Sequence, residues 1–338
     1  MFLRSSRHLL TGRGINFLSH TSASALSPLP SSPWKVVESK QSLFQSLAQL
    51  SKPKLSALVL LTSLTGYIAA PLSIHGSSPG HMALMLTGTA LCSASANTFN
   101  QWAEAPLDAQ MSRTKGRPLP RLAVTPLTAF TWACVAGGSG VGLLAASCGV
   151  VPAGWAAMTV ILYAGVYTPL KRLSLYNTWI GAVVGAIPPL IGWSAVDPSL
   201  SLQALFLPGL LYMWQFPHFM ALSWNLRAEY ARAGYQMASL LNPALNRRVA
   251  LRYSLALVPL TLAATPLWLD LCEPAFGLTG NLANLVLLGG AFRFWRDGDE
   301  TAKGKKAARR LFFLSLIHLP VVMGLFLYHR KRQLQEQE

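Results

Sequence analysis

Charged residues are scarce in this sequence, and acidic residues are scarcest of all. Only 12% of its 338 residues are charged, compared with roughly 25% in a typical soluble domain. Asp and Glu together number 12, against 28 Lys and Arg. Hydrophobic residues make up 52% of the chain, and its mean hydropathy is +0.37. This composition excludes an ordinary soluble enzyme and indicates a protein that crosses a membrane several times.

Paired cysteines and a phosphate-binding glycine loop are also missing. The cysteines stand alone and include no Cys-x-x-Cys pair, which argues against a disulfide framework or a cysteine metal site; they are Cys92, Cys134, Cys148 and Cys272. The glycine-rich run "GGSGVG" at 137–142 lies inside an apolar segment and follows no strand pattern. Small residues in such a segment favour close helix packing instead of nucleotide binding.

The apolar runs predict an all-α, polytopic membrane protein with about nine transmembrane helices. Most runs reach the roughly 17 to 25 residues that span a bilayer, and the Gly and Pro within them are tolerated in membrane helices. The predicted spans are 55–72, 82–103, 123–147, 151–168, 177–196, 202–222, 249–269, 277–294 and 311–328.

Lys and Arg are absent from every second loop between these spans. The loops around 73–81, 148–152, 197–201 and 270–276 contain neither residue. The other loops hold Arg113, Lys115, Arg117, Arg121, Lys171, Arg172, Arg227, Arg232, Arg247, Arg248, Arg252, Arg293, Arg296, Lys303, Lys305, Lys306, Arg309 and Arg310. This asymmetry is the positive-inside pattern of membrane topology. It accounts for the net charge of +16 without a nucleic-acid partner.

The first forty residues form a separate region. No acid precedes Glu38, and the basic residues Arg4, Arg7, Arg13 and Lys35 lie among Ser, Thr, Leu and Pro. This composition is typical of a mitochondrial transit peptide; the alternative is a basic tail that stays attached. We therefore expect residues 1–40 to be a targeting segment, 41–54 a pre-membrane segment, 55–328 the helical domain and 329–338 a polar tail. The basic loops are then expected to face the matrix side of the mitochondrial inner membrane.

Three oxygen-bearing side chains share one helix face at the end of the second span. Asn100, Glu104 and Asp108 are spaced by four residues, which places them about 6 Å apart along a helix axis. Carboxylate and amide oxygens are ligands that Mg²⁺ prefers, with substrate phosphates filling further positions. The alternative is that the two acids merely pair with nearby Lys and Arg. Pro106 is expected to kink or end this helix.

Basic residues follow these acids closely enough to bind a polyanion that the metal would bring. Arg113, Lys115 and Arg117 lie in the next loop, where they could neutralise phosphate oxygens. Two later loops add candidates of the same kind, namely Lys171, Arg172, Arg227, Arg232 and a third acid, Glu229.

Aromatic residues and one histidine are expected near this face. The aromatic residues could form an interfacial belt or stabilise a carbocation through their ring faces; they are Phe99, Trp102, Tyr167, Trp214, Phe216, Phe219 and Trp224. His218 is a rare ionisable group inside a span, and is a site candidate for that reason. For His318 we expect a buried, hydrogen-bonded role.

The three runs "NQWAEAPLDAQMSRTKGRPLP", "YTPLKRLSLYNTWIGAVVGAIPPLIGW" and "WQFPHFMALSWNLRAEYARAGYQM" together resemble the intramembrane prenyltransferases, and in particular their heme-directed branch. The resemblance covers about residues 50 to 325. It implies Mg²⁺-dependent transfer of a farnesyl group from farnesyl diphosphate to a vinyl group of heme b. The product would be heme o, in the route to the heme a of cytochrome c oxidase.

Site residues carried over by the resemblance fall on the motifs already noted. Metal ligands and catalytic groups would be Asn100, Glu104, Asp108 and Glu229; the diphosphate would contact Arg113, Lys115, Arg117, Lys171, Arg172 and Arg227; heme or the prenyl chain would contact Tyr167, His218 and Tyr230. The chain departs from the usual pattern twice. Glu104 replaces an Asp, and Ala228 replaces the first acid of a pair, which leaves the number of Mg²⁺ ions open.

Other functions fit part of the pattern. The metal and phosphate residues cannot distinguish heme from a quinone ring as the acceptor. A transporter also carries polar residues within its spans, but usually near the midplane, whereas these cluster at one face. A non-catalytic assembly factor leaves the acid spacing unexplained. An enzyme that modifies heme o next is a reasonable partner, and the oligomeric state stays open.

Overall fold

The computed structural model describes residues 42–71 and 78–331, and all of its regular elements there are helices. The targeting segment predicted for residues 1–40 lies outside the described residues, as does most of the predicted C-terminal tail. The elements are α1 (Leu43–Leu50), α2 (Pro53–Ala69), α3 (Pro79–Asp108), α4 (Pro126–Ser147), α5 (Val150–Ile161), η1 (Leu162–Tyr167), α6 (Thr168–Leu173), α7 (Asn177–Ala186), α8 (Pro188–Val196), η2 (Gln203–Leu205), α9 (Phe206–Asn225), α10 (Arg227–Arg232), α11 (Ala238–Leu241), α12 (Pro243–Ala263), α13 (Pro274–Asp297) and α14 (Ala302–Tyr328).

The all-α prediction is confirmed, and every predicted span overlaps a helix. Within the described residues, five helical segments are long and apolar enough to cross a membrane: 126–147, 150–173, 177–196, 274–297 and 302–328. The count of nine spans stays a prediction, because the other helices are shorter, less apolar or richer in polar residues. Proline and polar side chains in those helices reduce the apolar signal without interrupting the helix.

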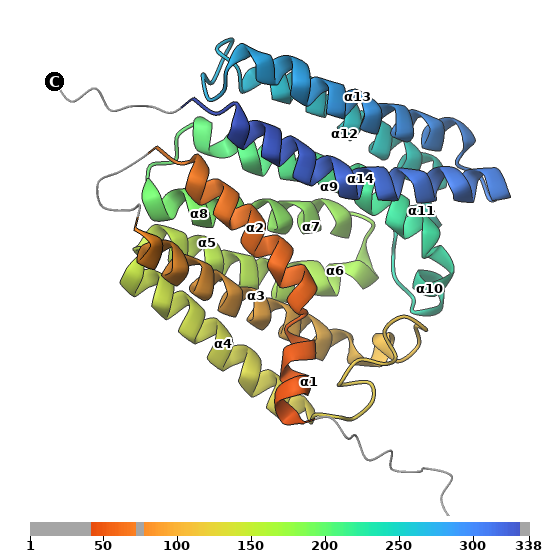
Figure 1. Ribbon diagram of the computed structural model, residues 1–338. Helices are drawn as coiled ribbons and strands as arrows, with labels where there is room; N and C mark the ends of the chain where they lie inside the picture. Colours follow the sequence, from red (N-terminus) through yellow and green to blue (C-terminus); the bar gives the residue numbers. More distant parts are fainter. Residues whose placement is uncertain (1–41, 72–77, 332–338) are drawn as a thin grey trace, which may run out of the picture. The chain divides into compact units, whose positions relative to one another are not determined.

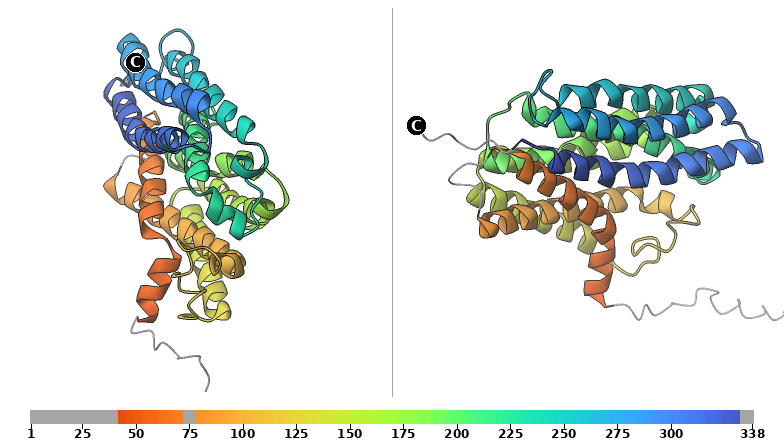
Figure 2. Two further views of the ribbon diagram at one scale, coloured as in Figure 1. Left: turned by 90° about the vertical axis from the view of Figure 1, so that its right-hand side faces the viewer. Right: turned by 45° about the horizontal axis from the view of Figure 1, so that its top comes forward.

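The helices of residues 42–331 pack in layers that are visible in two views (Figures 1 and 2). Helices α3, α4 and α5 pack on one another at one side, and α13 packs on both α12 and α14 at the other. Helices α7, α8 and α9 lie between them, while α2 packs on α8 and α3. The loop after α3 gathers with α10, α11 and the start of α14 at the right-hand end in Figure 1. The basic loops therefore share one end of the helices, as the charge pattern predicts.

Proline and a π-helical turn shape two of the predicted spans. Span 177–196 consists of α7 and α8, which meet at Ile187 directly before Pro188 and Pro189. Span 151–168 ends in the π-helical turn η1, which carries Tyr163 and Tyr167. Such turns inside α-helices occur frequently at functional sites.

Glycine allows α2 and α8 to approach closely. A Cβ atom added at Gly192 would lie 1.8 Å from the Ser63 carbonyl oxygen, and one at Gly66 would lie 2.1 Å from that of Pro189. Ser63 donates a hydrogen bond of 2.8 Å from its Oγ to the Pro188 carbonyl across the same contact. Small residues provide this kind of close contact between membrane helices, where burial from water contributes little.

Gly192→Ala should therefore destabilise the protein, by about 1–3 kcal/mol or more, because the methyl group overpacks a backbone contact. Gly154→Ala is the matched control, since nothing lies within 4 Å of its added Cβ and alanine is the better helix former by about 0.8–1.0 kcal/mol. Thermal unfolding in detergent micelles measures both variants. An unfolding midpoint that is equal or higher in Gly192→Ala would contradict the close contact.

Candidate active site

The polar face of α3 is buried at the end that carries the basic loops. Asn100, Glu104 and Asp108 are 1%, 5% and 2% exposed, and their spacing of four keeps them on one side of the helix. The helix continues through Pro106 and ends at Asp108, so the end expected near Pro106 comes two residues later. Pro106 lies on the exposed side of the last turn, so the backbone hydrogen bond that it removes is not a buried one.

Each of these three side chains contacts a basic nitrogen. Lys171 of α6 lies with its Nζ 2.7 Å from Glu104 Oε1, and Arg117 of the loop after α3 donates to Asp108 Oδ2 at 2.6 Å. Lys52, which directly precedes α2, donates to Asn100 Oδ1 at 2.8 Å. Each of the three side chains thus has an oxygen beside a basic nitrogen, and for the two acids this is the pairing with Lys and Arg that the sequence left open as the alternative to a metal site. Hard oxygen ligands of this kind suit Mg²⁺.

Lys52 is a site residue that the sequence did not identify. Its backbone is left-handed, with φ 48° and ψ 64°, a conformation that costs a non-glycine residue free energy and is often found at functional sites. Burial lowers the pKa of Lys52 to about 7, and the nearby charges of Arg117 and Lys171 act in the same direction. The only sequence signal was a lysine directly before the proline that begins a span.

Two threonines form hydrogen bonds with residues of the polar face of α3. Asn100 donates from Nδ2 to Thr168 Oγ1 at 3.0 Å, which fixes the amide so that Oδ1 faces Lys52. Thr114 donates from Oγ1 to the Asp108 carbonyl at 3.0 Å and so holds the following loop against the end of the helix. The positions of the oxygens therefore depend on α6 and on the loop.

The second acidic motif docks onto the loop of the first. Glu229 Oε1 accepts hydrogen bonds from Ser112 Oγ at 2.5 Å and from Arg232 at 2.7 Å. The Ser112 hydrogen bond is the chief reason that the pKa of Glu229 is lowered. Its other oxygen, Oε2, is buried and has no hydrogen-bond partner. Among the described residues no group of three or more His, Cys, Asp and Glu side chains lies close enough to hold a metal, so a metal site here depends on the α3 ligands.

The remaining predicted phosphate ligands lie apart from this set. Arg113, Lys115 and Arg172 are exposed at the same end of the helices. Arg227 instead pairs with Glu300 at 3.0 Å and lies 4.6 Å above the ring of Trp224. The structure thus brings Lys171 and Arg117 to the α3 acids and leaves Arg227 in a different contact.

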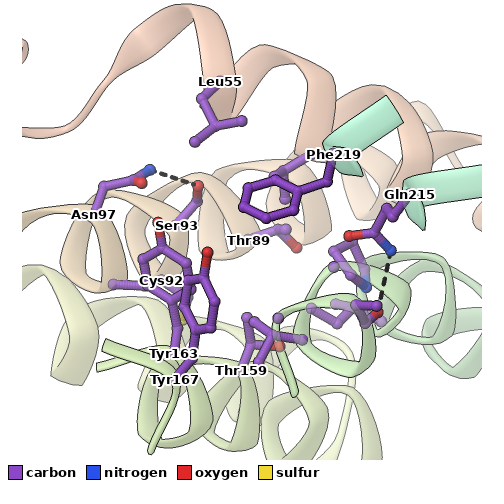
Figure 3. Close-up of a pocket in the computed structure, with 18 of the residues that line it drawn as sticks. Leu55, Thr89, Cys92, Ser93, Asn97, Thr159, Tyr163, Tyr167, Gln215 and Phe219 are labelled. Atoms are coloured by element: carbon purple, nitrogen blue, oxygen red, sulfur yellow. Dashed lines mark hydrogen bonds between the residues drawn. The ribbon is translucent and has the colours of Figure 1, made fainter. Parts of the chain in front are cut away.

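An apolar cavity of about 350 Å³ begins one helical turn from the polar face. Side chains of α2, α3, α5, η1, α7, α8 and α9 line it, and its volume is within the usual range of about 300–1,000 Å³ for small-molecule sites. Tyr163 and Tyr167 stack with ring centroids 5.4 Å apart, and Figure 3 shows them opposite Phe219 across the cavity. Lys171 Nζ lies 4.5 Å from the Tyr167 ring centroid. This cation–π contact joins the charged face to the cavity.

The two other predicted acceptor-binding residues differ in position. His218 lines the cavity, where its ring stacks on Trp214 at 4.9 Å and its Nδ1 lies 2.9 Å from Ser315 Oγ. Tyr230 is buried instead against Tyr235 and Met111 under the loop after α3. The predicted buried role of His318 fits its hydrogen bond of 2.9 Å to Asn284 Oδ1.

Apolar helices, a buried row of side-chain oxygens and an adjoining apolar cavity fit an intramembrane enzyme of the prenyltransferase class. A profile of the UbiA prenyltransferase family matches residues 59–317, and the chain belongs to this family.

Two relatives with high sequence identity are both named mitochondrial protoheme IX farnesyltransferase. The mitochondrial protoheme IX farnesyltransferase of Homo sapiens is 45% identical over 83% of this chain, and that of Arabidopsis thaliana is 44% identical over 83%. The aligned regions cover 61% and 64% of those two relatives. The chain thus spans about three fifths of the length of these curated relatives.

Solved structures show the same fold at low sequence identity. A digeranylgeranylglyceryl phosphate synthase superposes with a TM-score of 0.69 at 12% identity, over 85% of this chain and 98% of that one. A UbiA homologue from Archaeoglobus fulgidus bound to DMAPP and Mg²⁺ gives a TM-score of 0.64 at 13% identity, over 83% and 99% of the two chains. The predicted class of fold is therefore confirmed.

The Glu104–Lys171 pair should be coupled in stability, because both side chains are buried. Glu104→Gln and Lys171→Met should each cost about 3–5 kcal/mol, since each leaves a buried charge without its partner. The double variant should cost clearly less than the sum, and unfolding measured in detergent without substrate tests this. Arg232→Met provides the control, because Arg232 is 58% exposed in its pair with Glu229 and such pairs stabilise little. Additive effects of the two buried changes would refute the coupling.

Proposed function

We propose that this chain transfers a farnesyl group from farnesyl diphosphate to a vinyl group of heme b, which gives heme o and diphosphate. The observation that carries the proposal is the row of buried oxygens on α3, each beside a basic nitrogen, at the edge of an apolar cavity. A substrate with a charged head and a long apolar chain needs a polar site for the head directly beside an apolar cavity for the chain. The names of the relatives supply the acceptor.

The α3 face is proposed to hold the diphosphate through Mg²⁺. Asn100, Glu104 and Asp108 supply oxygen ligands of the right chemistry, and the metal would stabilise charge on the leaving group as a Lewis acid. The A. fulgidus homologue bound to DMAPP and Mg²⁺ supports this assignment. Glu229 is a further candidate ligand, because its Oε2 is buried without a partner.

The basic side chains are proposed to change partners when substrate arrives. Lys52, Lys171 and Arg117 are held by the same oxygens that a metal would use. With those oxygens engaged, the three cations are free to bind phosphate oxygens and to stabilise the negative charge that develops as the allylic C–O bond breaks. Arg113, Lys115 and Arg172 lie at the same end of the helices and could contribute from the loops.

The cavity is proposed to hold the apolar chain and the reacting carbon. When the C–O bond breaks, its electron pair leaves with the diphosphate and an allylic cation forms. Tyr163, Tyr167 and Phe219 border the cavity, and their ring faces stabilise a cation that is shielded from water. The electron pair of a vinyl group then forms the new C–C bond. Water adds to the resulting cation and releases a proton, which completes a hydroxyethylfarnesyl group.

His218 is proposed to bind the acceptor. Its Nδ1 contacts Ser315 and its ring lies between those of Trp214 and Phe312, so the ring is held in place at the cavity wall.

The protein that carries out this reaction is proposed to lie in the mitochondrial inner membrane, with its basic loops facing the matrix. The apolar helices, the one-sided loop charge and the mitochondrial names of the relatives support that location.

Purified protein in detergent should convert heme b, farnesyl diphosphate and Mg²⁺ into a farnesyl-modified heme, and a chelator should abolish the conversion. Chromatography with mass detection follows the product. Asp108→Asn should lower turnover by at least about 10²-fold, as removal of a group that stabilises transition-state charge does.

Asp270→Asn is the matched control for that substitution. Asp270 is a carboxylate at the opposite end of the helices, paired with Lys331, and its left-handed backbone suits asparagine. Full activity in Asp108→Asn would contradict the proposed binding of a metal by the α3 face. Absence of product from folded wild-type protein would overturn the proposed reaction.

Acceptor choice is tested by the absorption spectrum of added heme b. His218→Ala should weaken heme binding by about tenfold or more, which corresponds to about 1.4 kcal/mol, while retention of farnesyl diphosphate stays unchanged. His81→Gln, at the start of α3 and outside the cavity lining, should leave both unchanged. If the wild-type chain shows no heme spectrum but prenylates a quinone precursor, the acceptor is a quinone ring instead.

A further inference from the structure

A second pocket lies between the start of α12 and the end of α13. It has a volume of about 390 Å³ and is lined by Ala244, Arg247, Arg248, Trp295 and Arg296. The two helices pack against each other, and the loop that joins them lies at their other ends. No carboxylate lines the pocket, whereas three guanidinium groups and an indole ring do. None of these residues takes part in the active site proposed above.

The charge of this pocket is only partly neutralised. Arg296 is held by Asp297 through two hydrogen bonds of 2.9 Å. Arg247 and Arg248 form no salt bridge with any other described residue, and Nε of Arg247 is buried without a hydrogen-bond partner. Asp299 is an acid near Arg247, and its pKa is lowered mainly by Thr301 and to a lesser degree by Arg247. A buried N–H donor that lacks an acceptor costs free energy.

Guanidinium groups on neighbouring helices favour one type of anion. Their planar N–H donors match the oxygens of a phosphate group, to which arginine can bind through two parallel hydrogen bonds. The pocket also offers the Trp295 ring, which is suited to the boundary between lipid and water.

The pocket lies at the end of exposed apolar stripes on both helices. On α13 the stripe consists of Leu278, Leu282, Leu285, Gly289 and Phe292, and the next position in the same spacing is Arg296. Helix α13 is long and apolar enough to cross a membrane, so this stripe faces lipid and Arg296 marks its polar end. Phe292 and Trp295 are both exposed, with ring centroids 5.6 Å apart.

Helix α12 repeats this arrangement in the reverse direction. After Pro243 and Ala244, its exposed positions are Arg248 and Arg252, followed by Leu255, Pro259 and Leu262. Because the first turns of α12 and the last turns of α13 line one pocket, both stripes lead away from the same basic end. A ligand with a phosphate head and apolar chains fits this pattern, whereas a free phosphate makes no use of the stripes.

We propose that this pocket binds the phosphate of an anionic glycerophospholipid, whose acyl chains lie along the outer stripes of α12 and α13. Basic pockets between membrane helices recognise anionic headgroups in this way. The bound lipid places its phosphate charge beside the guanidinium groups of Arg247 and Arg248 and links the two helices at their basic ends. Because the pocket is separate from the α3 face, the proposal does not depend on the transfer reaction.

Lipid retention by the full chain tests the proposal. The protein, purified in a neutral detergent, is titrated with phosphatidylglycerol, with phosphatidylcholine of the same acyl chains and with inorganic phosphate. Native mass spectrometry measures the bound molecules, and the thermal unfolding midpoint measures their effect. Phosphatidylglycerol should bind and raise the midpoint, whereas phosphatidylcholine and phosphate should have little effect.

The double variant Arg247→Gln and Arg248→Gln should bind phosphatidylglycerol about 30-fold more weakly, which corresponds to ~2 kcal/mol at about 1 kcal/mol for each basic residue near an anionic lipid. Arg309→Gln with Arg310→Gln is the matched control, because both residues are exposed in the first half of α14 and lie outside the pocket lining. Arg248→Gln alone, at an exposed position, replaces the double variant if the latter fails to fold.

Three outcomes would overturn the proposal. Equal losses of phosphatidylglycerol binding in the two double variants indicate that positive charge anywhere at this end attracts the lipid. Protection by inorganic phosphate as strong as that by phosphatidylglycerol indicates a site for a soluble anion. Equal retention of phosphatidylcholine and phosphatidylglycerol indicates that headgroup charge is not recognised.

Discussion

The interaction on which the structure depends is the neutralisation of two carboxylates buried at the end of α3. Glu104 and Asp108 are almost fully shielded from solvent, and like charges one turn apart repel each other. A charge at this depth is costly unless it is paired. Lys171 and Arg117 provide that pairing, and Lys52 adds a third cation at Asn100. The need to pair these buried acids brings together the start of α2, helix α6 and the loop after α3.

The same requirement explains how a site so rich in charge can lie beside an apolar cavity. The cations neutralise the acids, and in the proposed reaction they would contact phosphate once a metal engages the acids. On this proposal the net charge of the site differs little between the free and the substrate-bound states. The neighbouring cavity wall then does not have to accommodate an unpaired ion. Lys171 takes part in both regions, because it contacts Glu104 on one side and the Tyr167 ring on the other.

Sequence alone was sufficient for properties that are local or periodic. Apolar runs located the helices, alternation of loop charge located the basic end, and the spacing of Asn100, Glu104 and Asp108 placed them on one buried face. It was insufficient for contacts between distant segments. Lys52 and Lys171 lie 48 and 67 residues from their partners, and nothing in their own neighbourhoods indicates which acid or amide they meet. Arg227 was predicted at the diphosphate for its place in a motif, but a later acid, Glu300, pairs with it.

The π-helical turn η1 gives the chain an unusual sensitivity to length. A π turn holds one residue more than an α-helical turn would, and each residue of an α-helix rotates the next one by about 100° around the axis. Loss of one residue between Leu162 and Tyr167 that restored a regular helix would turn α6 about its axis and carry Lys171 away from Glu104. Substitutions in this segment alter the cavity wall one side chain at a time. Deletion of one residue would instead separate the charged face of α3 from the apolar cavity.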